Sequence, residues 1–373
     1  MKSQTYPGGV VVLFILMTFG VVVAQDEDMV LQGKPVSEWI KQLRSENRGL
    51  QLRAVQVLCN APSNLHERIM MQVIPVLRSE RENDKFAAAQ VLGSYGAVAR
   101  PAIPDLLPML EGTQYERNRA AAAKALGQIL KDAKPDEEVE KVTQALIKAF
   151  NDPYSDVRRE ALRACGMIGP AAKSCIPHLA AKLTEGGVTG GAWGKDEIYL
   201  VREAAAYCVM RMGPLAKEHV DLMIAKLHQE GQKSPIWVQA LGAIGPVHEN
   251  VAKNIVDKLE VPDPAMWWML EAYDVLASFG PGAEPAVDLA ARYLRECKLP
   301  GAGAIKLLRL LKSIGPAATN ALPVIKSYLN IKAYNQRHGG PATAEEVAEM
   351  RKEASAAWEA ITGQKPPADA EQK

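Results

Sequence analysis

Aromatic residues and net charge are both scarce in this sequence. Phe, Trp and Tyr make up 6% of the 373 residues, and 44 Lys and Arg stand against 43 Asp and Glu. Few aromatics argue against a β-sheet protein, because strands are enriched in aromatic and β-branched residues. A chain without a basic excess lacks the charge that drives binding to phosphate backbones, so no nucleic-acid partner is expected. The G-x-S-x-G motif of a serine nucleophile and a phosphate-binding glycine loop are also missing, so no catalytic residues are predicted.

Long apolar runs are rare, and the longest lies at the N-terminus. It extends from Gly8 to Ala24, behind the positive Lys2 and before the acidic stretch QDED. A bilayer span needs about 20 apolar residues, and this run is shorter. We interpret residues 1–24 as a cleaved secretory signal peptide. The protein is then expected in a periplasm, a cell envelope or the extracellular space, with no stable membrane span after cleavage. An uncleaved N-terminal membrane anchor is the alternative.

A recurring turn is the strongest pattern in the sequence. The dipeptide Gly-Pro begins at residues 169, 213, 245, 280 and 315, in steps of 44, 32, 35 and 35. Related turns lie near Pro62, Gly96 and Leu130. Gly ends one helix because it tolerates positive φ, and Pro suits the start of the next because no N–H donor is needed there. A period in the mid-thirties is typical of a solenoid of helical hairpins.

Apolar residues keep one register relative to these turns. The positions four residues before each turn are Leu58, Leu92, Leu126, Cys165, Val209, Leu241, Leu276 and Leu311. The positions eight residues before it are mostly Ala, which lets a neighbouring helix come close. A spacing of four places both sets on one helical face, so the pattern predicts an all-α fold. A second Pro, eight residues after the turn at residues 104, 177 and 323, predicts a bend inside the following helix.

One repeat resembles a known family. Residues 152–169, DPYSDVRREALRACGMIG, are similar to a HEAT repeat of the phycobilisome-lyase-like subtype, in which Asp-Pro precedes a Val-Arg-x-x-Ala helix. The resemblance implies a right-handed α-α superhelix, or solenoid, whose second helices line a concave binding face. It also implies hydrogen bonds between neighbouring repeats. Asp152 and Arg158 match both family positions for these bonds, whereas Arg119 and Arg202 match only the Arg.

The repeat pattern divides the chain into an array and its ends. Residues 1–24 are the signal peptide, 25–35 a short linker, 36–332 the HEAT-like array of about nine hairpins including an N-terminal cap, 333–342 a linker, 343–362 a C-terminal capping helix and 363–373 a disordered tail. The helix over residues 343–362 is interpreted as a cap because the last repeat of a solenoid must cover its apolar face.

Two His-Glu pairs are weak candidates for metal ligands: His66 with Glu67, and His248 with Glu249. Imidazole and carboxylate suit iron, and deoxyhypusine hydroxylase, another HEAT-type protein, uses four such pairs. This chain has two pairs in distant repeats, so neither a metal nor a cofactor is predicted. An iron-dependent hydroxylase or a bilin lyase is the enzymatic alternative to a protein without catalytic residues.

Cysteine is scarce, with five residues and no C-x-x-C pair. Cys165 occupies a position that holds Leu in most other units, and Cys208 one that holds small apolar residues, so both are interpreted as core. Cys165 and Cys175 stand on either side of Gly169-Pro170, on helices predicted to be antiparallel. A disulfide between these two is the alternative, in an oxidising compartment.

Two tryptophans are candidates for partner binding. Trp193 lies in a glycine-rich insertion, residues 184–196, and insertions in repeats often carry binding. Trp267 precedes Trp268 on a second helix and, about 100° further round, is predicted to face the concave side. The expected function is a non-catalytic scaffold that binds a protein or peptide on its concave face. A structural envelope spacer is a second alternative.

Overall fold

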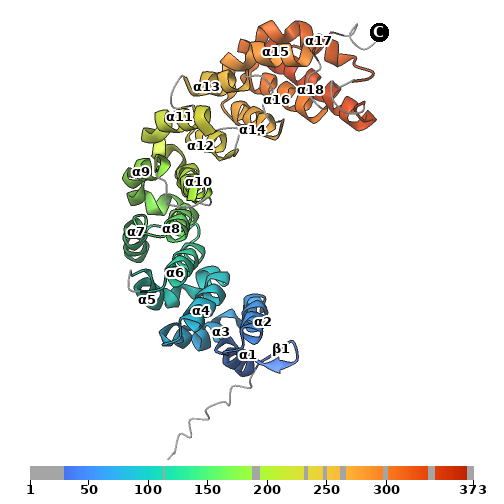
Figure 1. Cartoon of the computed structure of the whole chain (residues 1–373). Coiled ribbons are helices and arrows are strands. Elements are labelled where there is room, and N and C mark those ends of the chain that lie inside the picture. Colours follow the sequence, from blue (N-terminus) through green and yellow to red (C-terminus); the bar gives the residue numbers. More distant parts are fainter. Residues whose placement is uncertain are drawn as a thin grey trace, which may run out of the picture.

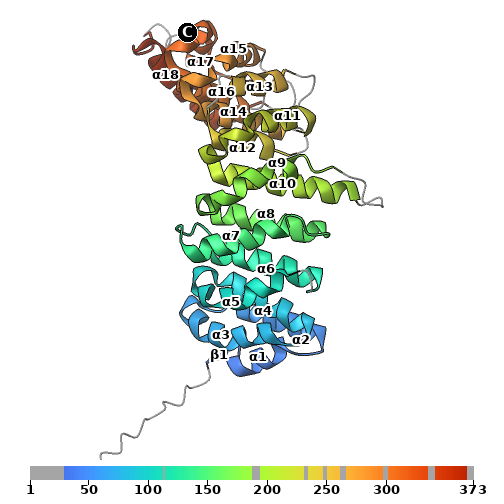
Figure 2. The same cartoon turned by 90° about the vertical axis from the view of Figure 1, so that its left-hand side faces the viewer.

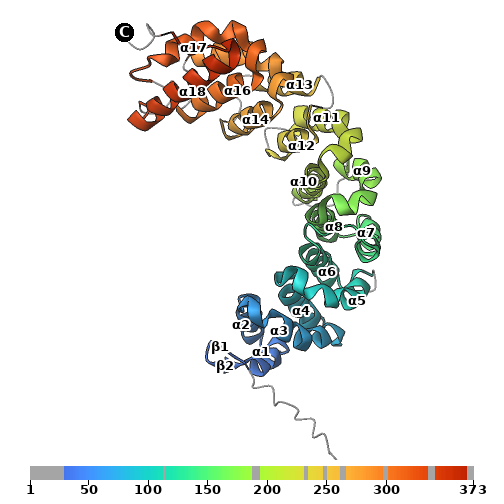
Figure 3. The same cartoon turned by 180° about the vertical axis from the view of Figure 1, so that it is seen from behind.

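The protein forms two rows of helices that follow an open, C-shaped arc (Figure 1). The computed structural model describes residues 29–111, 114–186, 194–230, 234–246, 250–260, 266–296, 301–334 and 341–367. The N-terminal helices lie at one end of the arc and the C-terminal helices at the other, as Figure 3 shows from behind. The all-α solenoid predicted from the repeat is confirmed.

Even-numbered helices line the concave side of the arc, and odd-numbered helices its convex side (Figures 1 and 3). The inner row consists of α2 (Arg48–Cys59), α4 (Glu82–Ser94), α6 (Glu116–Ile129), α8 (Ser155–Ile168), α10 (Gly194–Met212), α12 (Ile236–Ile244), α14 (Met266–Ser278), α16 (Gly301–Ile314) and α18 (Ala344–Thr362). The outer row consists of α1 (Val36–Leu43), α3 (His66–Val73), α5 (Ile103–Leu106), α7 (Glu137–Ala149), α9 (Leu179–Leu183), α11 (Val220–Glu230), α13 (Asn250–Leu259), α15 (Val287–Arg295) and α17 (Leu322–Leu329). Among the described residues, no helix combines the length and the apolar character needed to cross a membrane.

The Gly-Pro turns connect each inner helix to the next outer segment. The five glycines of these turns have φ between 57° and 88°, the left-handed region that favours glycine. A 3₁₀ segment follows several of the turns, such as η5 (Gly169–His178) and η8 (Gly315–Ala321). Pro104 and Pro323 consequently lie in the first turn of α5 and α17, where a missing N–H costs little, and Pro177 lies in η5. The prolines therefore lie where a 3₁₀ segment passes into an α-helix, and not in the interior of an α-helix as the spacing predicted.

The predicted apolar register is buried throughout. All eight residues four positions before the turns, from Leu58 to Leu311, have 0% exposure, and so do the alanines eight positions before them. One continuous core therefore runs between the two rows of helices. Cys165 and Cys208 belong to this core, as predicted, and so does Trp268.

Inner helices approach one another most closely at glycines. A Cβ atom added to Gly127 of α6 would lie 2.5 Å from the Cα atom of Ala164 in α8, and one added to Gly166 of α8 would lie 2.6 Å from the Tyr207 ring in α10. Real Cβ atoms do not come this close to backbone. Glycine at these places thus sets the spacing between adjacent repeats.

The N-terminal end differs from the predicted linker. Within residues 25–35, β1 (Val30–Leu31) and β2 (Lys34–Pro35) pair as a short antiparallel hairpin. The indole N–H of Trp39 in α1 donates to the Leu31 carbonyl at 2.8 Å, and the Lys34 ammonium lies 5.0 Å from the centroid of the Trp39 ring. These contacts attach the hairpin to the first repeat.

The C-terminal end is completed by α18. Thr343 caps this helix, and its hydroxyl accepts from the N–H of Glu346, whose carboxylate accepts from the N–H of Thr343. Gly363 ends it with a φ of 70°. Val347, Met350 and other apolar residues of α18 are buried where it packs against α16 and α17. The helix is therefore the inner member of the last hairpin and continues the inner row.

Candidate functional site: the inner groove

A groove runs along the concave side of the arc. It consists of three adjoining hollows of about 60, 570 and 480 Å³, lined by inner helices and the residues just before α12. The first two hollows share Phe86 and Arg117, and the second and third share Lys124 and Glu160. We call this surface the inner groove. It is continuous over six consecutive inner helices, α2 to α12.

The N-terminal part of the inner groove offers an aromatic and aliphatic surface. Phe86 of α4 is half-buried, and the guanidinium carbon of Arg117 in α6 lies 3.6 Å from its ring centroid. This cation–π contact holds the Arg117 side chain across the groove floor. Leu52 of α2 lies in the same hollow and is 52% exposed. The hollow therefore presents apolar area to solvent next to a fixed positive charge.

Charges of both signs line the middle of the inner groove. Arg159 of α8 pairs with Asp156 at 2.7 Å and with Glu160 at 3.2 Å, and Arg163 lies 3.9 Å from Glu160. These carboxylates balance the arginines locally and would repel a phosphate backbone. The groove is therefore better suited to a polypeptide than to a nucleic acid.

The C-terminal part of the inner groove lies along α8, α10 and α12. Tyr207 of α10, Met167 of α8 and Ile236 of α12 supply its apolar lining. The helix α10 projects beyond its neighbours at one edge of the solenoid (Figure 2). Residues 184–196 were expected to form a loop, but the chain is helical from Gly194 onward. The insertion thus lengthens an inner helix next to the third hollow.

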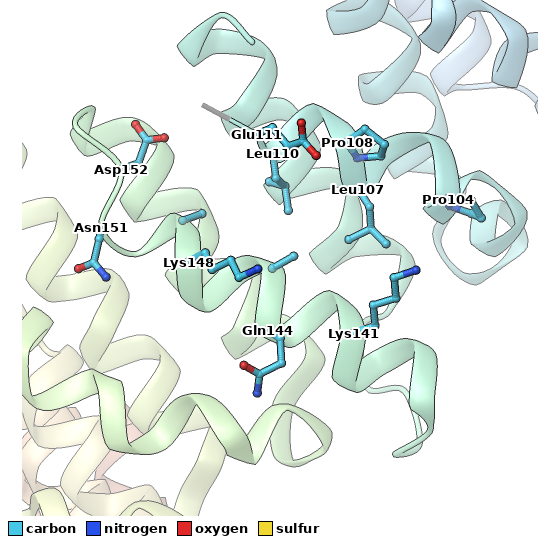
Figure 4. Close-up of a pocket in the computed structure, with 12 residues that line it drawn as sticks. Pro104, Leu107, Pro108, Leu110, Glu111, Lys141, Gln144, Lys148, Asn151 and Asp152 are labelled. Atoms are coloured by element: carbon cyan, nitrogen blue, oxygen red, sulfur yellow. The ribbon is translucent and has the colours of Figure 1, made fainter. Parts of the chain in front are cut away.

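A second cleft, of about 770 Å³, lies on the outer row between α7 and the segment that contains α5. Leu107 and Leu110 point toward α7, and Lys148 extends into the gap (Figure 4). This outer cleft is confined to two neighbouring repeats. It lacks the length of the inner groove and serves below as a control surface.

Three arginines bind neighbouring repeats together in the same way. Arg119 of α6 donates two hydrogen bonds to the Asp152 carboxylate of the next repeat, at 2.7 and 2.9 Å. Arg158 of α8 reaches Glu185 at 2.8 Å, and Arg202 of α10 reaches Glu230 at 3.0 Å. Each arginine also donates to a backbone carbonyl in the segment that precedes its own helix, in residues Gln114, Asp152 and Glu185 respectively. We call these three pairs the arginine ladder.

The ladder residues are largely buried, and their charges depend on one another. The side chains of Arg119 and Asp152 are 5% and 7% exposed. Burial by itself would raise the pKa of Asp152, but hydrogen bonds from Arg119 and from the Tyr154 N–H lower the pKa below its usual value. The carboxylate is therefore held in its charged form in the folded protein.

The three ladder arginines share one position in the repeat, eleven residues before the turn. In the first five repeats this position holds a polar residue: Gln51, Lys85, Arg119, Arg158 and Arg202. Gln51 donates to Asp84 of the next repeat at 3.4 Å, and Lys85 to Gln114 at 3.2 Å. The last three repeats have Ser234, Met269 and Ala304 at this position. The ladder therefore supports the same repeats as the inner groove and then stops.

His66 serves the core of its own repeat. Its Nε2 atom lies 2.9 Å from the Ala61 carbonyl oxygen, and its ring stacks on Tyr95 with centroids 4.0 Å apart. Glu67 is exposed at the surface, and His248 and Glu249 lie outside the described residues. Within the described part of the chain, no group of His, Cys, Asp or Glu is arranged to hold a metal.

Three buried thiols meet near the third hollow. Cys165 and Cys175 are free thiols in the structure, so the alternative of a disulfide between them is not found. The Sγ atom of Cys175 instead lies 3.6 Å from that of Cys208 in α10, because η5 places Cys175 between α8 and α10. Burial and a hydrogen bond to Cys175 raise the pKa of Cys165, and hydrogen bonds from Cys165 and Cys208 lower the pKa of Cys175.

The two tryptophans proposed for partner binding are not placed by the structure. Trp193 lies outside the described residues. Trp267 is in the first turn of α14, but its side chain is outside those described.

The groove residues were not singled out from the sequence. A periodic signal existed, since the position ten residues before each turn holds Leu52, Phe86, Ala120, Arg159, Glu203 and Pro235, all of which line the inner groove.

Comparison with a family model identifies the repeat. Residues 36–127 and 103–186 match a model described as HEAT repeats. Over these segments the chain is similar to HEAT repeats. The arginine ladder and the N-terminal two hollows of the inner groove lie largely within this part of the chain. The sequence matches no curated protein.

Three solved structures have a similar fold. An engineered protein is 18% identical, with a TM-score of 0.55, and the match covers 90% of each chain. Kap121p bound to Nup53p is 13% identical, with a TM-score of 0.61, and importin beta is 16% identical, with a TM-score of 0.60. The match covers 90% of this chain in both cases, but 40% of Kap121p and 47% of importin beta. At these identities the likeness concerns the fold.

Proposed function

We propose that the protein is a non-catalytic scaffold that binds an extended protein or peptide segment in the inner groove, outside the cytoplasm. The continuity of the groove over six inner helices carries this proposal, since an elongated and open surface suits a chain better than a compact small molecule. Kap121p, which has a similar fold, is described as bound to Nup53p, and this supports a protein partner in general terms.

The composition of the groove supports a polypeptide occupant. Phe86 and Leu52 offer apolar contact area, and Arg117, held over the Phe86 ring, supplies a fixed donor for backbone carbonyls or carboxylates. The mixture of arginines and carboxylates further along accommodates side chains of either sign. Trp193 and Trp267 are proposed as additional anchors for the same partner. The phycobilisome-lyase-like subtype stays a prediction without a bearing on this role.

Selection of peptides from a random displayed library tests the proposal. Peptides that bind the intact protein are expected to lose at least about tenfold in affinity when Arg117 is changed to Glu or Phe86 to Ala, because each change removes a central contact of about 1.4 kcal/mol or more. Lys148→Glu in the outer cleft is the matched control and should leave affinity unchanged. An equal loss of affinity in all three variants, or the failure to select any binding peptide, would refute the inner groove as the binding site.

The export part of the proposal has its own test. Protein recovered from expressing cells is expected to begin at Gln25, since cleavage after Ala24 removes the signal peptide. Mass spectrometry of the N-terminal peptide measures this directly. An N-terminal peptide that still contains residues 1–24, in protein extracted only by detergent, would favour the membrane-anchored alternative.

A further inference from the structure

The three buried thiols are the one nucleophilic cluster of the described residues that the proposed function does not use. Cys165 belongs to inner helix α8, Cys175 to the outer segment η5, and Cys208 to inner helix α10. Each is 0% exposed. The Sγ atoms of Cys175 and Cys208 are 3.6 Å apart, in van der Waals contact. A disulfide between them requires the two sulfurs to move closer, to a bonding distance of about 2.05 Å.

We propose that Cys175 and Cys208 form a disulfide when the protein folds in the presence of a disulfide oxidant. The bond joins the outer and inner halves of a single repeat. It encloses the chain from Ile176 to Tyr207, which contains the insertion of residues 184–196. Three thiols allow two other pairings. Cys165 with Cys175 encloses little more than the Gly169-Pro170 turn, and Cys165 with Cys208 joins two inner helices, α8 and α10.

The position of the bond follows from the cost of closing this repeat. Its two halves are joined by the longest connection in the series, since the step from turn 169 to turn 213 is 44 residues, against 32 to 35 in the following repeats. A longer connection costs more entropy to close. A cross-link across the longer loop removes more freedom from the unfolded chain than one across a tight turn. A bond between Cys175 and Cys208 is therefore expected to stabilise the protein more than one between Cys165 and Cys175. The contact between the two sulfurs, 3.6 Å apart, favours it over the pairing of Cys165 with Cys208.

The chemistry balances with a low-molecular-weight disulfide such as oxidised glutathione. The Cys175 thiolate attacks one sulfur of the oxidant, forms a mixed disulfide and releases one glutathione thiolate. The Cys208 thiolate then attacks the Cys175 sulfur, closes the protein disulfide and releases the second glutathione. The two protein thiols are oxidised, the glutathione disulfide is reduced to two thiols, and the two protein protons end on the departing glutathiones.

Burial decides when this exchange takes place. With all three thiols at 0% exposure, the oxidant reaches them before α10 docks on η5, or during local opening of this repeat. Once formed, the bond is enclosed by the same packing and is protected from reductants. Oxidation is therefore expected during refolding and to be slow on the folded, reduced protein.

Peptide mapping of refolded protein tests the proposal. The full chain is unfolded, reduced, refolded in a mixture of oxidised and reduced glutathione, blocked with iodoacetamide and digested without reduction. We expect one cross-linked peptide pair containing Cys175 and Cys208, and a melting temperature roughly 5 °C above that of protein refolded in reductant alone. Cross-linking of Cys165 to Cys175 or to Cys208, or full alkylation of Cys175 and Cys208, would overturn the proposal.

Serine variants separate the pair from its neighbours. Cys165→Ser should keep both the cross-linked peptide and the oxidant-dependent rise in melting temperature, because it leaves the bonding pair intact. Cys208→Ser should lose both. Cys59→Ser is the control for general effects of losing a thiol, since Cys59 is a free cysteine in α2, outside the cluster. If Cys208→Ser fails to fold, the Cys165→Ser result still shows whether Cys165 takes part in the bond.

Discussion

Arg119 and Asp152 belong to different repeats, yet two parallel hydrogen bonds fix the guanidinium of one against the carboxylate of the other. The N–O distances are 2.7 and 2.9 Å, and both side chains are almost completely buried. A paired guanidinium and carboxylate of this kind is specific in geometry as well as in charge. The pair therefore fixes how α6 and α8 stack, and with it the shape of the groove above them.

Removing one partner of this pair is expected to be costly. Asp152→Ala leaves the Arg119 guanidinium buried without its counter-charge, and we expect a loss of roughly 3 kcal/mol in the free energy of unfolding. Urea unfolding followed by circular dichroism measures it. Asp105→Asn is the control, because Asp105 pairs with the exposed Arg78, and its midpoint should stay near that of the wild type. Similar losses in both variants would contradict the role given to burial.

The same pair makes stability depend on pH in the acid range. The pKa of Asp152 is lower in the folded protein than the ordinary value of about 3.9. Its contribution is thus fully present above that value and is lost as the pH falls through the folded pKa. The difference in unfolding free energy between wild type and Asp152→Asn should shrink as the pH is lowered from 6 to 2. A constant difference over this range would show that the charge of Asp152 is not what matters.

The glycine contact between α6 and α8 predicts a steric effect. Gly127→Ala places a methyl group against the backbone of Ala164, so α8 must move away, and we expect a destabilisation of about 1–3 kcal/mol. Thermal unfolding measures the effect. Gly186→Ala is the matched substitution, since its nearest neighbour, the Thr184 carbonyl oxygen, is 3.8 Å away. Gly127→Ala without loss of stability would mean that α6 and α8 tolerate a wider spacing.

His66 gives a test that separates packing from metal binding. His66→Ala removes the ring stacked on Tyr95 and the contact with the Ala61 carbonyl, and we expect a loss of about 1–2 kcal/mol. Ferrous iron should leave the melting temperature of the wild-type protein unchanged. An iron-dependent rise in melting temperature that disappears in His66→Ala would restore the metal interpretation.

Removal of α18 tests whether this helix caps the C-terminal end of the solenoid. Ending the chain at residue 333 removes α18 and uncovers the face of α16 that packs against it. Solenoids need a polar end to stay soluble, so the shortened protein is expected to associate. Light scattering during size-exclusion chromatography measures this. A monomeric shortened protein with an unchanged melting temperature would show that α18 is not a cap.

The sequence predicted the repeating core far better than the surface. Burial repeats with the turn, so the leucine positions from Leu58 to Leu311 could be read from spacing alone, and so could the helix after residue 343. The hairpin at Val30–Pro35 was missed because it is short and gains its stability from Trp39, which a local pattern does not reveal. The 3₁₀ segments were missed because Gly-Pro indicates a turn without specifying how the chain leaves it.

The groove required a different use of the same register. Leu52 and Phe86 hold equivalent positions in consecutive repeats, but the following repeats place Ala, Arg, Glu and Pro there. Exposed positions in successive repeats can hold residues of different types, because they pack against no common core. The residue types therefore did not indicate the groove, and only their spacing from the turn could have done so. The acidic partner of Arg158 is Glu185, which lies at the start of the insertion, where the sequence departs from the repeat. Contacts of that kind depend on where a variable loop brings the chain.

The point at which the arginine ladder stops divides the solenoid mechanically. From α2 to α10 neighbouring repeats are joined by polar contacts, and the three arginine pairs are largely buried. Further on, links such as Lys306 with Asp274 and Arg292 with Glu260 are partly exposed and weaker. Each repeat of a solenoid contacts only its neighbours, so the contacts between adjacent repeats set how easily the solenoid deforms. The repeats from α2 to α10 are therefore expected to resist bending more than the C-terminal repeats. Under tension between the two ends of the solenoid, the C-terminal repeats should extend first.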